Sequence, residues 1–235
     1  MNAPWEDPRI ARGMREQLRR RRELLERGEM PLGWKLAFGG PAAMERLFIQ
    51  APLVGFLLQK AVVPSGAKVL LRGWTKPAAE PELAVHLGRD LSVGADRRTA
   101  MAAIVGLGAA IEVADVDHPS EDVEGTLAAN IFQRHVILGR CESKQAGANL
   151  TGLSARVLKG GVELANTSDF EALTGELIDI VLHTANVLSY FGETLNAGEI
   201  IIAGSITPPI WVQPGDEITF QLAPSEPISV SFTAI

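Results

Sequence analysis

The chain of 235 residues contains one cysteine, Cys141, and few aromatic side chains. A single cysteine excludes an internal disulfide framework and a cysteine-ligated zinc cluster. Aromatic residues make up only 6%, whereas glycine (23) and proline (14) are plentiful. This mixture favours many short strands that are joined by tight turns.

The chain also has no excess of basic residues: it contains 22 lysines and arginines and 28 acidic residues, which give a formal net charge of -6. A nucleic-acid partner requires a basic surface, so this charge argues against one. The run Arg19–Arg22 is diluted by flanking glutamates and indicates a solvated helix face. No apolar run has membrane-spanning length, and residues 1–7 lack a signal-peptide pattern. We therefore expect a cytoplasmic protein without a membrane or nucleic-acid partner.

Helix signals and short apolar runs alternate along the chain. Asp7 is a good N-cap, Pro8 suits the first helical position, and Gly28 ends the helix that we expect over 7–27. Further helices are expected over 41–47, 97–107 and 172–191, and an irregular apolar segment over 49–58. Short strands are expected over 33–38, 62–64, 68–71, 80–87, 109–116, 136–139, 153–158, 162–164, 199–203, 210–212, 218–220 and 228–232.

These elements predict an α+β fold: a mixed, mainly antiparallel β-roll with flanking helices and an N-terminal helix. No glycine-rich fingerprint lies between a strand and a helix, so a Rossmann unit is excluded. We expect residues 1–235 to form a single catalytic domain. Within it, residues 1–60 would form an N-terminal helical or lid portion, and residues 61–235 the β-roll core.

Two carboxylates stand two residues apart at the start of an apolar run, Glu80 and Glu82. In a strand both project from the same face, about 7 Å apart, because side chains alternate with period two. Two anions so placed require a shared cation or solvent. Oxygen ligands suit a hard ion such as Mg²⁺ or Mn²⁺. A solvated strand face is the alternative.

Glu112 lies inside an almost wholly apolar strand, where burying a carboxylate is costly unless a charge compensates it. A shared cation with Glu80 and Glu82 would explain it, while Asp115 points to the opposite face and is expected to be structural. Lys35, within another apolar strand, either reaches solvent with its ammonium group or serves in a pocket as a hydrogen-bond donor or proton carrier.

Several short motifs in a fixed order resemble the fumarylacetoacetate hydrolase superfamily, in its branch of 2-keto-4-pentenoate hydratases and 4-oxalocrotonate decarboxylases. The resemblance runs from about residue 33 to the C-terminus. Its motifs are Gly33-Trp34-Lys35-Leu36, Glu80-x-Glu82, the strand of Glu112, Asn130, Ala197-Gly198-Glu199 through Gly204-Ser205, and Pro214-Gly215-Asp216.

The resemblance implies one Mg²⁺ or Mn²⁺ ion on Glu80, Glu82 and Glu112. A 2-oxo acid would chelate this ion, which as a Lewis acid would stabilise an enolate. It also implies a catalytic role for Lys35, in place of a solvated ammonium group, and a substrate carboxylate at Ser205 and Thr207. A homo-oligomer is expected from the family, and a complex with a related pathway enzyme is possible.

Two segments depart from the family pattern. Gln59-Lys60 stands where hydratases of this branch carry two aspartates, which puts hydration in question. Asn130 is retained as a catalytic candidate, but the acid before it and the hydroxyls after it are replaced, and Phe132 would make the pocket more apolar. Gln59 and Phe132 are therefore candidate substrate contacts. His86 shares the face of Glu80 and Glu82 but is expected to lie outside the site.

Three functions follow from the resemblance. The first is metal-dependent hydration of 2-hydroxypenta-2,4-dienoate-like acids in the catabolism of aromatic compounds. The second is decarboxylation of a 4-oxalocrotonate-like oxo-diacid, which the missing aspartates favour. The third is a non-catalytic, metal-binding partner subunit. Hydrolysis of a diketone is disfavoured, because no histidine precedes His86.

Overall fold

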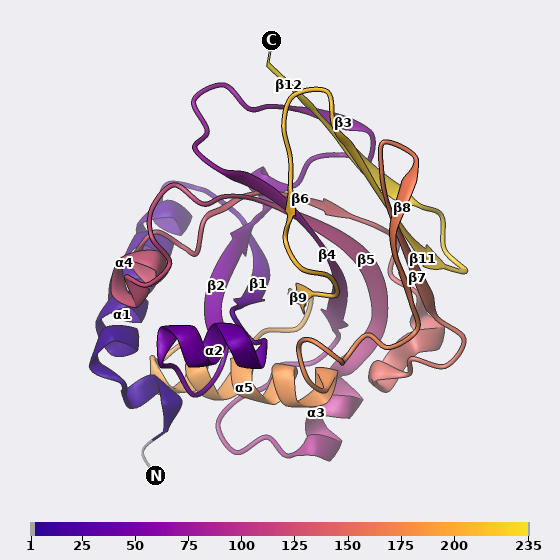
Figure 1. Ribbon diagram of the computed structural model, residues 1–235. Helices are drawn as coiled ribbons and strands as arrows, with labels where there is room; N and C mark the ends of the chain where they lie inside the picture. The colour runs from indigo at the N-terminus through magenta and orange to yellow at the C-terminus, as the bar shows by residue number, and fades with distance from the viewer. Residues whose placement is uncertain (1–2, 235) are drawn as a thin grey trace.

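A curled sheet with helices around it and a second sheet beside it make up the computed structural model, which describes residues 3–234 (Figure 1). The helices are α1 (Pro8–Glu26), α2 (Pro41–Leu47), α3 (Arg97–Ala103), α4 (Val123–Ala128) and α5 (Leu177–Tyr190), with 3-10 turns η1 (Pro4–Glu6), η2 (Gln59–Ala61) and η3 (Ser143–Ala148). The strands are β1 (Pro31–Ala37), β2 (Leu53–Leu58), β3 (Ala67–Leu70), β4 (Pro77–Leu87), β5 (Ile104–Asp115), β6 (Gln133–Leu138), β7 (Ser154–Lys159), β8 (Val162–Thr167), β9 (Ile200–Ser205), β10 (Ile210–Trp211), β11 (Glu217–Ala223) and β12 (Ile228–Thr233). Among these residues no helix has both the length and the apolar character that crossing a membrane requires.

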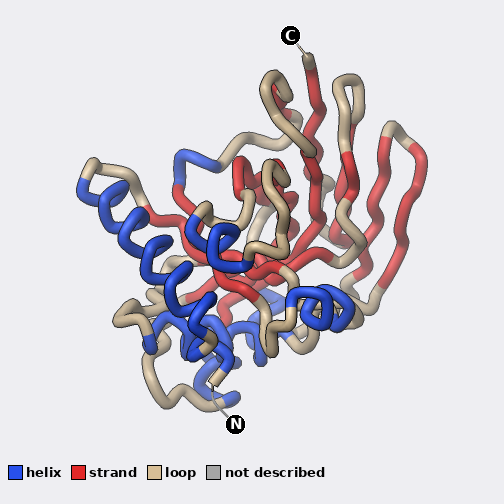
Figure 2. Tube along the Cα trace, turned by 60° about the vertical axis from the view of Figure 1, so that its left-hand side comes forward, coloured by secondary structure: helices blue, strands red, loops and turns tan. Residues whose placement is uncertain are grey.

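The large sheet has the strand order β2-β1-β9-β4-β5-β6, and β10 adds to β4. The smaller sheet has the order β3-β12-β11-β7-β8. Only β1 with β9 and β12 with β3 run parallel, and the other ladders are antiparallel. Figure 2 shows most of the helices on the left and lower side of the molecule and the strands of both sheets in its centre and on its right. The predicted mixed, mainly antiparallel α+β fold is confirmed.

Several predicted elements differ in the structure. The strand expected over 62–64 does not form: Val62 makes an isolated bridge to Val136, and residues 63–64 are not in a strand. Residues 53–58, expected to be irregular, form β2 against β1. The helix expected over 97–107 ends at residue 103, and residues 104–107 begin β5, because β-branched Ile104 and Val105 and the following Gly106 favour a strand that pairs with β4. Helix α5 begins at residue 177 instead of 172. Since β1 and β2 belong to the large sheet, that sheet continues across the division expected at residue 60, and the single domain stays a prediction.

The arginine run of α1 is only partly solvated. Arg21 is 5% exposed, lies 4.6 Å from the centre of the Trp34 ring, and pairs with Glu193 at 3.2 Å. The Trp34 indole in turn donates to Glu199 at 3.1 Å. This network fixes α1 against the outer face of β1.

The two faces of the large sheet bury different residues. The main core takes every second residue, such as Val85 of β4 and Ile201 of β9. Their neighbours Ala84 and Ile202 belong to a second, smaller apolar cluster on the opposite face. Side chains alternate along a strand, so Glu80 and Glu82 share the face of Ala84. The candidate site therefore lies inside the curl, above this smaller cluster.

Gly33 of β1 lies very close to the backbone of β9. Its φ is +151°, and a Cβ atom there would lie 2.0 Å from the carbonyl oxygen of Ile200. We expect Gly33→Ala to lower the free energy of unfolding by about 3 kcal/mol or more, because the clash and the unfavourable φ add. Denaturant unfolding measures this loss.

Gly66→Ala is the matched control, because Gly66 also has a positive φ (+82°) but no neighbour within 4 Å of the added Cβ. It should cost only about 1 kcal/mol. Equal losses in the two variants would contradict close packing of β1 on β9.

Candidate metal centre and its pocket

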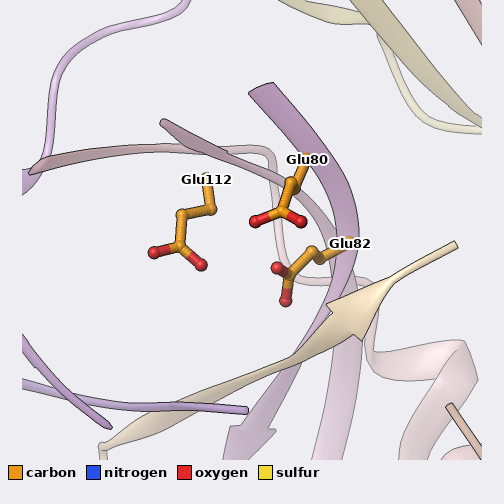
Figure 3. Close-up of side chains that lie close together, drawn as sticks. All are labelled: Glu80, Glu82 and Glu112. Atoms are coloured by element: carbon orange, nitrogen blue, oxygen red, sulfur yellow. The ribbon is translucent and has the colours of Figure 1, made fainter. Parts of the chain in front are cut away.

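Three carboxylates converge inside the curled sheet. Glu80 and Glu82 come from β4 and Glu112 from β5, where Glu80 and Glu112 are directly opposite in the ladder. Each residue contributes an oxygen, and these atoms lie within 4.8 Å of one another. Figure 3 shows the three side chains pointing toward one another. Glu82 and Glu112 are each 1% exposed, which does not fit a solvated strand face.

Burial governs the protonation of this cluster. Burial and, to a lesser degree, the nearby Glu112 charge raise the pKa of Glu80 to about 7 against the opposing effect of Lys35. Burial, followed by the charges of Glu112 and Glu80, raises the pKa of Glu82 well above its usual range, although the Gly204 amide donates to it at 2.8 Å. The pKa of Glu112 is also raised, mainly by burial. Without a cation the cluster therefore holds protons near neutral pH.

Lys35 lies at the base of the cluster and is 1% exposed, so the alternative of a solvated ammonium group is wrong. Its Nζ donates to Glu112 Oε1 and, at 3.1 Å, to the carbonyl oxygen of Ile131. Gly55 provides the space, because a Cβ there would lie 3.0 Å from the Lys35 Cγ.

Among residues 3–234, the buried oxygen Oε2 of Glu112 has no hydrogen-bond partner. Lys35 supplies one positive charge against three carboxylates, so the ionised cluster lacks two positive charges. A hard divalent cation would supply that charge and would be coordinated by Oε2 of Glu112. The donor set therefore fits a divalent metal ion.

A left-handed turn holds the carbonyl group that contacts Lys35. Asn130, Ile131 and Phe132 have φ values of 61°, 51° and 62°, which are unfavourable for residues other than glycine. The Asn130 side chain accepts from the Phe56 amide at 2.8 Å and donates to its carbonyl at 2.9 Å. Its amide group is thus committed to β2, and a catalytic role for Asn130 stays a prediction.

A pocket of about 740 Å³ opens above the carboxylates. Lys35, Glu80 and Glu82 lie at its base, and Ser205, Thr207 and Phe132 line its wall, as expected from the sequence. The Ser205 hydroxyl donates to the carbonyl of Pro81 at 3.3 Å, and the Thr207 hydroxyl donates to that of Pro208 at 3.0 Å.

Gln59 was predicted to contact the substrate, whereas His86 was expected to lie outside the site. Gln59 is exposed on η2 and is not among the pocket-lining residues of the described chain. His86 is half-buried further along β4, also outside that lining, and burial lowers its pKa.

Sequence reasoning missed Arg46, Lys76 and Trp211, which line the pocket with Phe38. Arg46 and Lys76 carried no signal, because isolated basic residues are typical of any surface.

Comparison with known proteins gives consistent matches. A model of the fumarylacetoacetate (FAA) hydrolase C-terminal family matches residues 40–228. A 2-hydroxyhexa-2,4-dienoate hydratase from Comamonas testosteroni is 27% identical over 211 residues, which cover 88% of this chain and 80% of the relative. A 4-oxalocrotonate decarboxylase from Pseudomonas putida is 29% identical over 219 residues, covering 92% and 82%.

The solved structure of 4-oxalocrotonate decarboxylase from Pseudomonas putida G7, complexed with calcium and acetate, superimposes with a TM-score of 0.83. It is 29% identical, and the match covers 92% of this chain and 83% of that one. The same enzyme complexed with magnesium and adipate gives a TM-score of 0.82 at 27% identity and the same coverage.

Proposed function

Because this chain belongs to the fumarylacetoacetate hydrolase family, we propose that it is a divalent-metal-dependent lyase that acts on 2-oxo or 2-hydroxydienoic acids. The most favoured reaction is hydration of a 2-hydroxypenta-2,4-dienoate-like acid to a 4-hydroxy-2-oxo acid, as in the catabolism of aromatic compounds. One observation carries the proposal: the carboxylates of Glu80, Glu82 and Glu112 meet beside the buried Lys35, and Lys35, Glu80 and Glu82 line one pocket.

Glu80, Glu82 and Glu112 would hold Mg²⁺ or Mn²⁺. Their oxygens suit a hard cation, and the related decarboxylase was solved with calcium and with magnesium. When bound, the ion would supply Lewis acidity to the carboxylate and keto oxygens of the substrate.

The side chains of the pocket would orient the substrate and move its protons. The hydroxyls of Ser205 and Thr207 would donate to the substrate carboxylate. Lys35, on the buried side of the pocket, would carry the proton that leaves the 2-hydroxyl group and is added at C5. This step leaves a double bond between C3 and C4. Water then adds its oxygen at C4 and its proton at C3, so that the product is the substrate plus one water molecule.

The test follows 2-hydroxypenta-2,4-dienoate by its diene absorbance in the presence of Mg²⁺ and the purified protein. We expect a loss of absorbance well above that of a chelator-treated control, because protonation at C5 removes the diene and addition of water then removes the remaining C3–C4 double bond. The same rate in both samples would contradict action on this substrate.

Decarboxylation of a 4-oxalocrotonate-like oxo-diacid is the second candidate. Among the described pocket-lining residues, the titratable groups are Lys35, Arg46, Lys76, Glu80 and Glu82. No further base is there to activate a water molecule, whereas decarboxylation needs only an electron sink and a proton. Release of CO₂ from 4-oxalocrotonate distinguishes the two reactions.

A non-catalytic partner subunit is the third candidate. Unchanged activity of a co-purified complex after Glu82→Gln would favour it, and loss of that activity would exclude it. The homo-oligomer, the complex with a pathway enzyme and the cytoplasmic location stay predictions.

A further inference from the structure

The pocket carries opposite charges at its two ends. The buried base holds the carboxylates, whereas the exposed side chains of Lys76 and Arg46 line the outer part. A small 2-oxo acid bound at the base would leave much of the roughly 740 Å³ unfilled, a volume in the range of pockets for drug-sized ligands. The outer cations are therefore candidates to contact a longer substrate.

Lys76 is the outer cation without an acidic partner. Its ammonium group lies 4.0 Å from the centre of the Trp211 ring, and no carboxylate of residues 3–234 forms an ion pair with it. Arg46, in contrast, pairs with Glu121 at 3.7 Å and donates to the Ser120 hydroxyl. A cation–π contact orients the ammonium group but leaves its full charge available to a ligand.

Hydrogen bonds fix the backbone of both Lys76 and Trp211. The Lys76 amide donates to Asp115 Oδ1 at 2.8 Å, and the Val116 amide donates to the Lys76 carbonyl at 3.0 Å. Trp211 pairs with Ala78 across the β10–β4 ladder, and its carbonyl accepts from Lys159 at 2.9 Å. The ammonium group thus lies at the pocket between two hydrogen-bonded backbone segments, the residue before β4 and strand β10.

We propose that Lys76, oriented by Trp211, binds a second carboxylate at the end of the substrate remote from the metal. The site would then bind 2-oxo dicarboxylates more tightly than monocarboxylates of equal length, which favours the oxo-diacid of the second candidate reaction over the dienoate of the first. This inference rests on the proposed function, because it takes the first carboxylate and the keto group to lie at the metal centre.

The test measures binding by isothermal titration calorimetry in Mg²⁺, with pyruvate, 2-oxohexanoate, 2-oxoadipate and 2-oxopimelate as probes. We expect wild-type protein to bind the better of the two diacids about fivefold more tightly than 2-oxohexanoate, as one partly exposed ion pair allows. Lys76→Met removes the ammonium group and its cation–π contact with Trp211, and leaves an unbranched side chain that is one heavy atom shorter and can still pack on the ring. It should remove this preference and change the affinity for pyruvate by less than twofold.

Lys68→Met is the control, because Lys68 is an exposed lysine of β3 outside the pocket lining. It should keep the diacid preference. If wild-type protein binds pyruvate but shows no diacid preference, or if Lys76→Met weakens all four ligands equally, the inference is wrong and the proposed function stands. If no 2-oxo acid binds in a Mg²⁺-dependent manner, the proposed function itself is overturned.

Discussion

Glu82→Gln is expected to abolish metal binding and to lower kcat/KM by about a hundredfold or more, because it removes one of three carboxylates from a buried cation site. The side chain is 1% exposed and accepts from the Gly204 amide, a hydrogen bond that the glutamine oxygen can keep. The fold should therefore survive the change. Steady-state kinetics in Mg²⁺ measure the loss of activity.

In the absence of metal, the melting temperature of the same variant should depend less on pH than that of the wild-type protein. The folded-state pKa of Glu82 is raised well above its unfolded value, and that of Glu80 is raised to about 7. The folded protein thus binds more protons than the unfolded chain, and the stability that these protons provide is lost as pH rises through the folded pKa values. Wild-type protein with chelator should melt at a lower temperature at about pH 8 than at about pH 5.5. Glu82→Gln removes one titrating group, so its decrease should be smaller.

Glu163→Gln is the control, because Glu163 is an exposed residue of β8 that pairs with Arg156 at the surface. It should keep both the pH dependence and the rise in melting temperature on adding Mg²⁺. If Glu82→Gln also kept that rise, the assignment of Glu82 as a ligand would be wrong.

Lys35→Met should lower the stability of the metal-free protein. Lys35 is the cation that contacts Glu112, and both side chains are almost fully buried. Removing one partner of a buried ion pair costs about 3–5 kcal/mol, since the remaining charge is uncompensated. The cost should be largest above pH 7, where the carboxylates ionise, and bound Mg²⁺ should restore part of it.

Activity of Lys35→Met should fall by about 10²–10⁴-fold, the usual contribution of a general acid or base, while metal binding is retained. Lys60→Met is the control, because Lys60 pairs with Glu29 at the surface and should cost at most about 1 kcal/mol. Wild-type activity in Lys35→Met would show that Lys35 takes no part in the reaction. Unchanged stability at high pH would contradict its role as the balancing charge.

Much of the metal centre could be predicted from the sequence. The period of two in a strand places Glu80 and Glu82 on one face, and the cost of burying Glu112 indicated a shared cation. That Glu80 lies directly opposite Glu112 could not be predicted, because it depends on the register of β4 against β5. The sequences of two consecutive strands do not reveal which of their residues pair.

The positions that were predicted wrongly or missed depend on backbone geometry, which the sequence does not reveal residue by residue. Gln59 turns to the surface because a 3-10 turn follows β2. Isoleucine and phenylalanine seldom adopt positive φ, so nothing in the sequence indicated the left-handed turn in which Ile131 and Phe132 follow Asn130. Lys76 and Trp211 are far apart in the chain and meet only because β10 adds to β4.

The most direct test of the account is a calorimetric titration of Mn²⁺ or Mg²⁺ into metal-stripped protein at about pH 7 and pH 8. We predict a single site in wild-type protein, with protons released on binding and fewer released at the higher pH, because the raised pKa values leave the cluster partly protonated near neutrality. Glu82→Gln should show no binding under the same conditions. Binding of equal strength in Glu82→Gln, or none in wild-type protein, would contradict a metal centre at Glu80, Glu82 and Glu112.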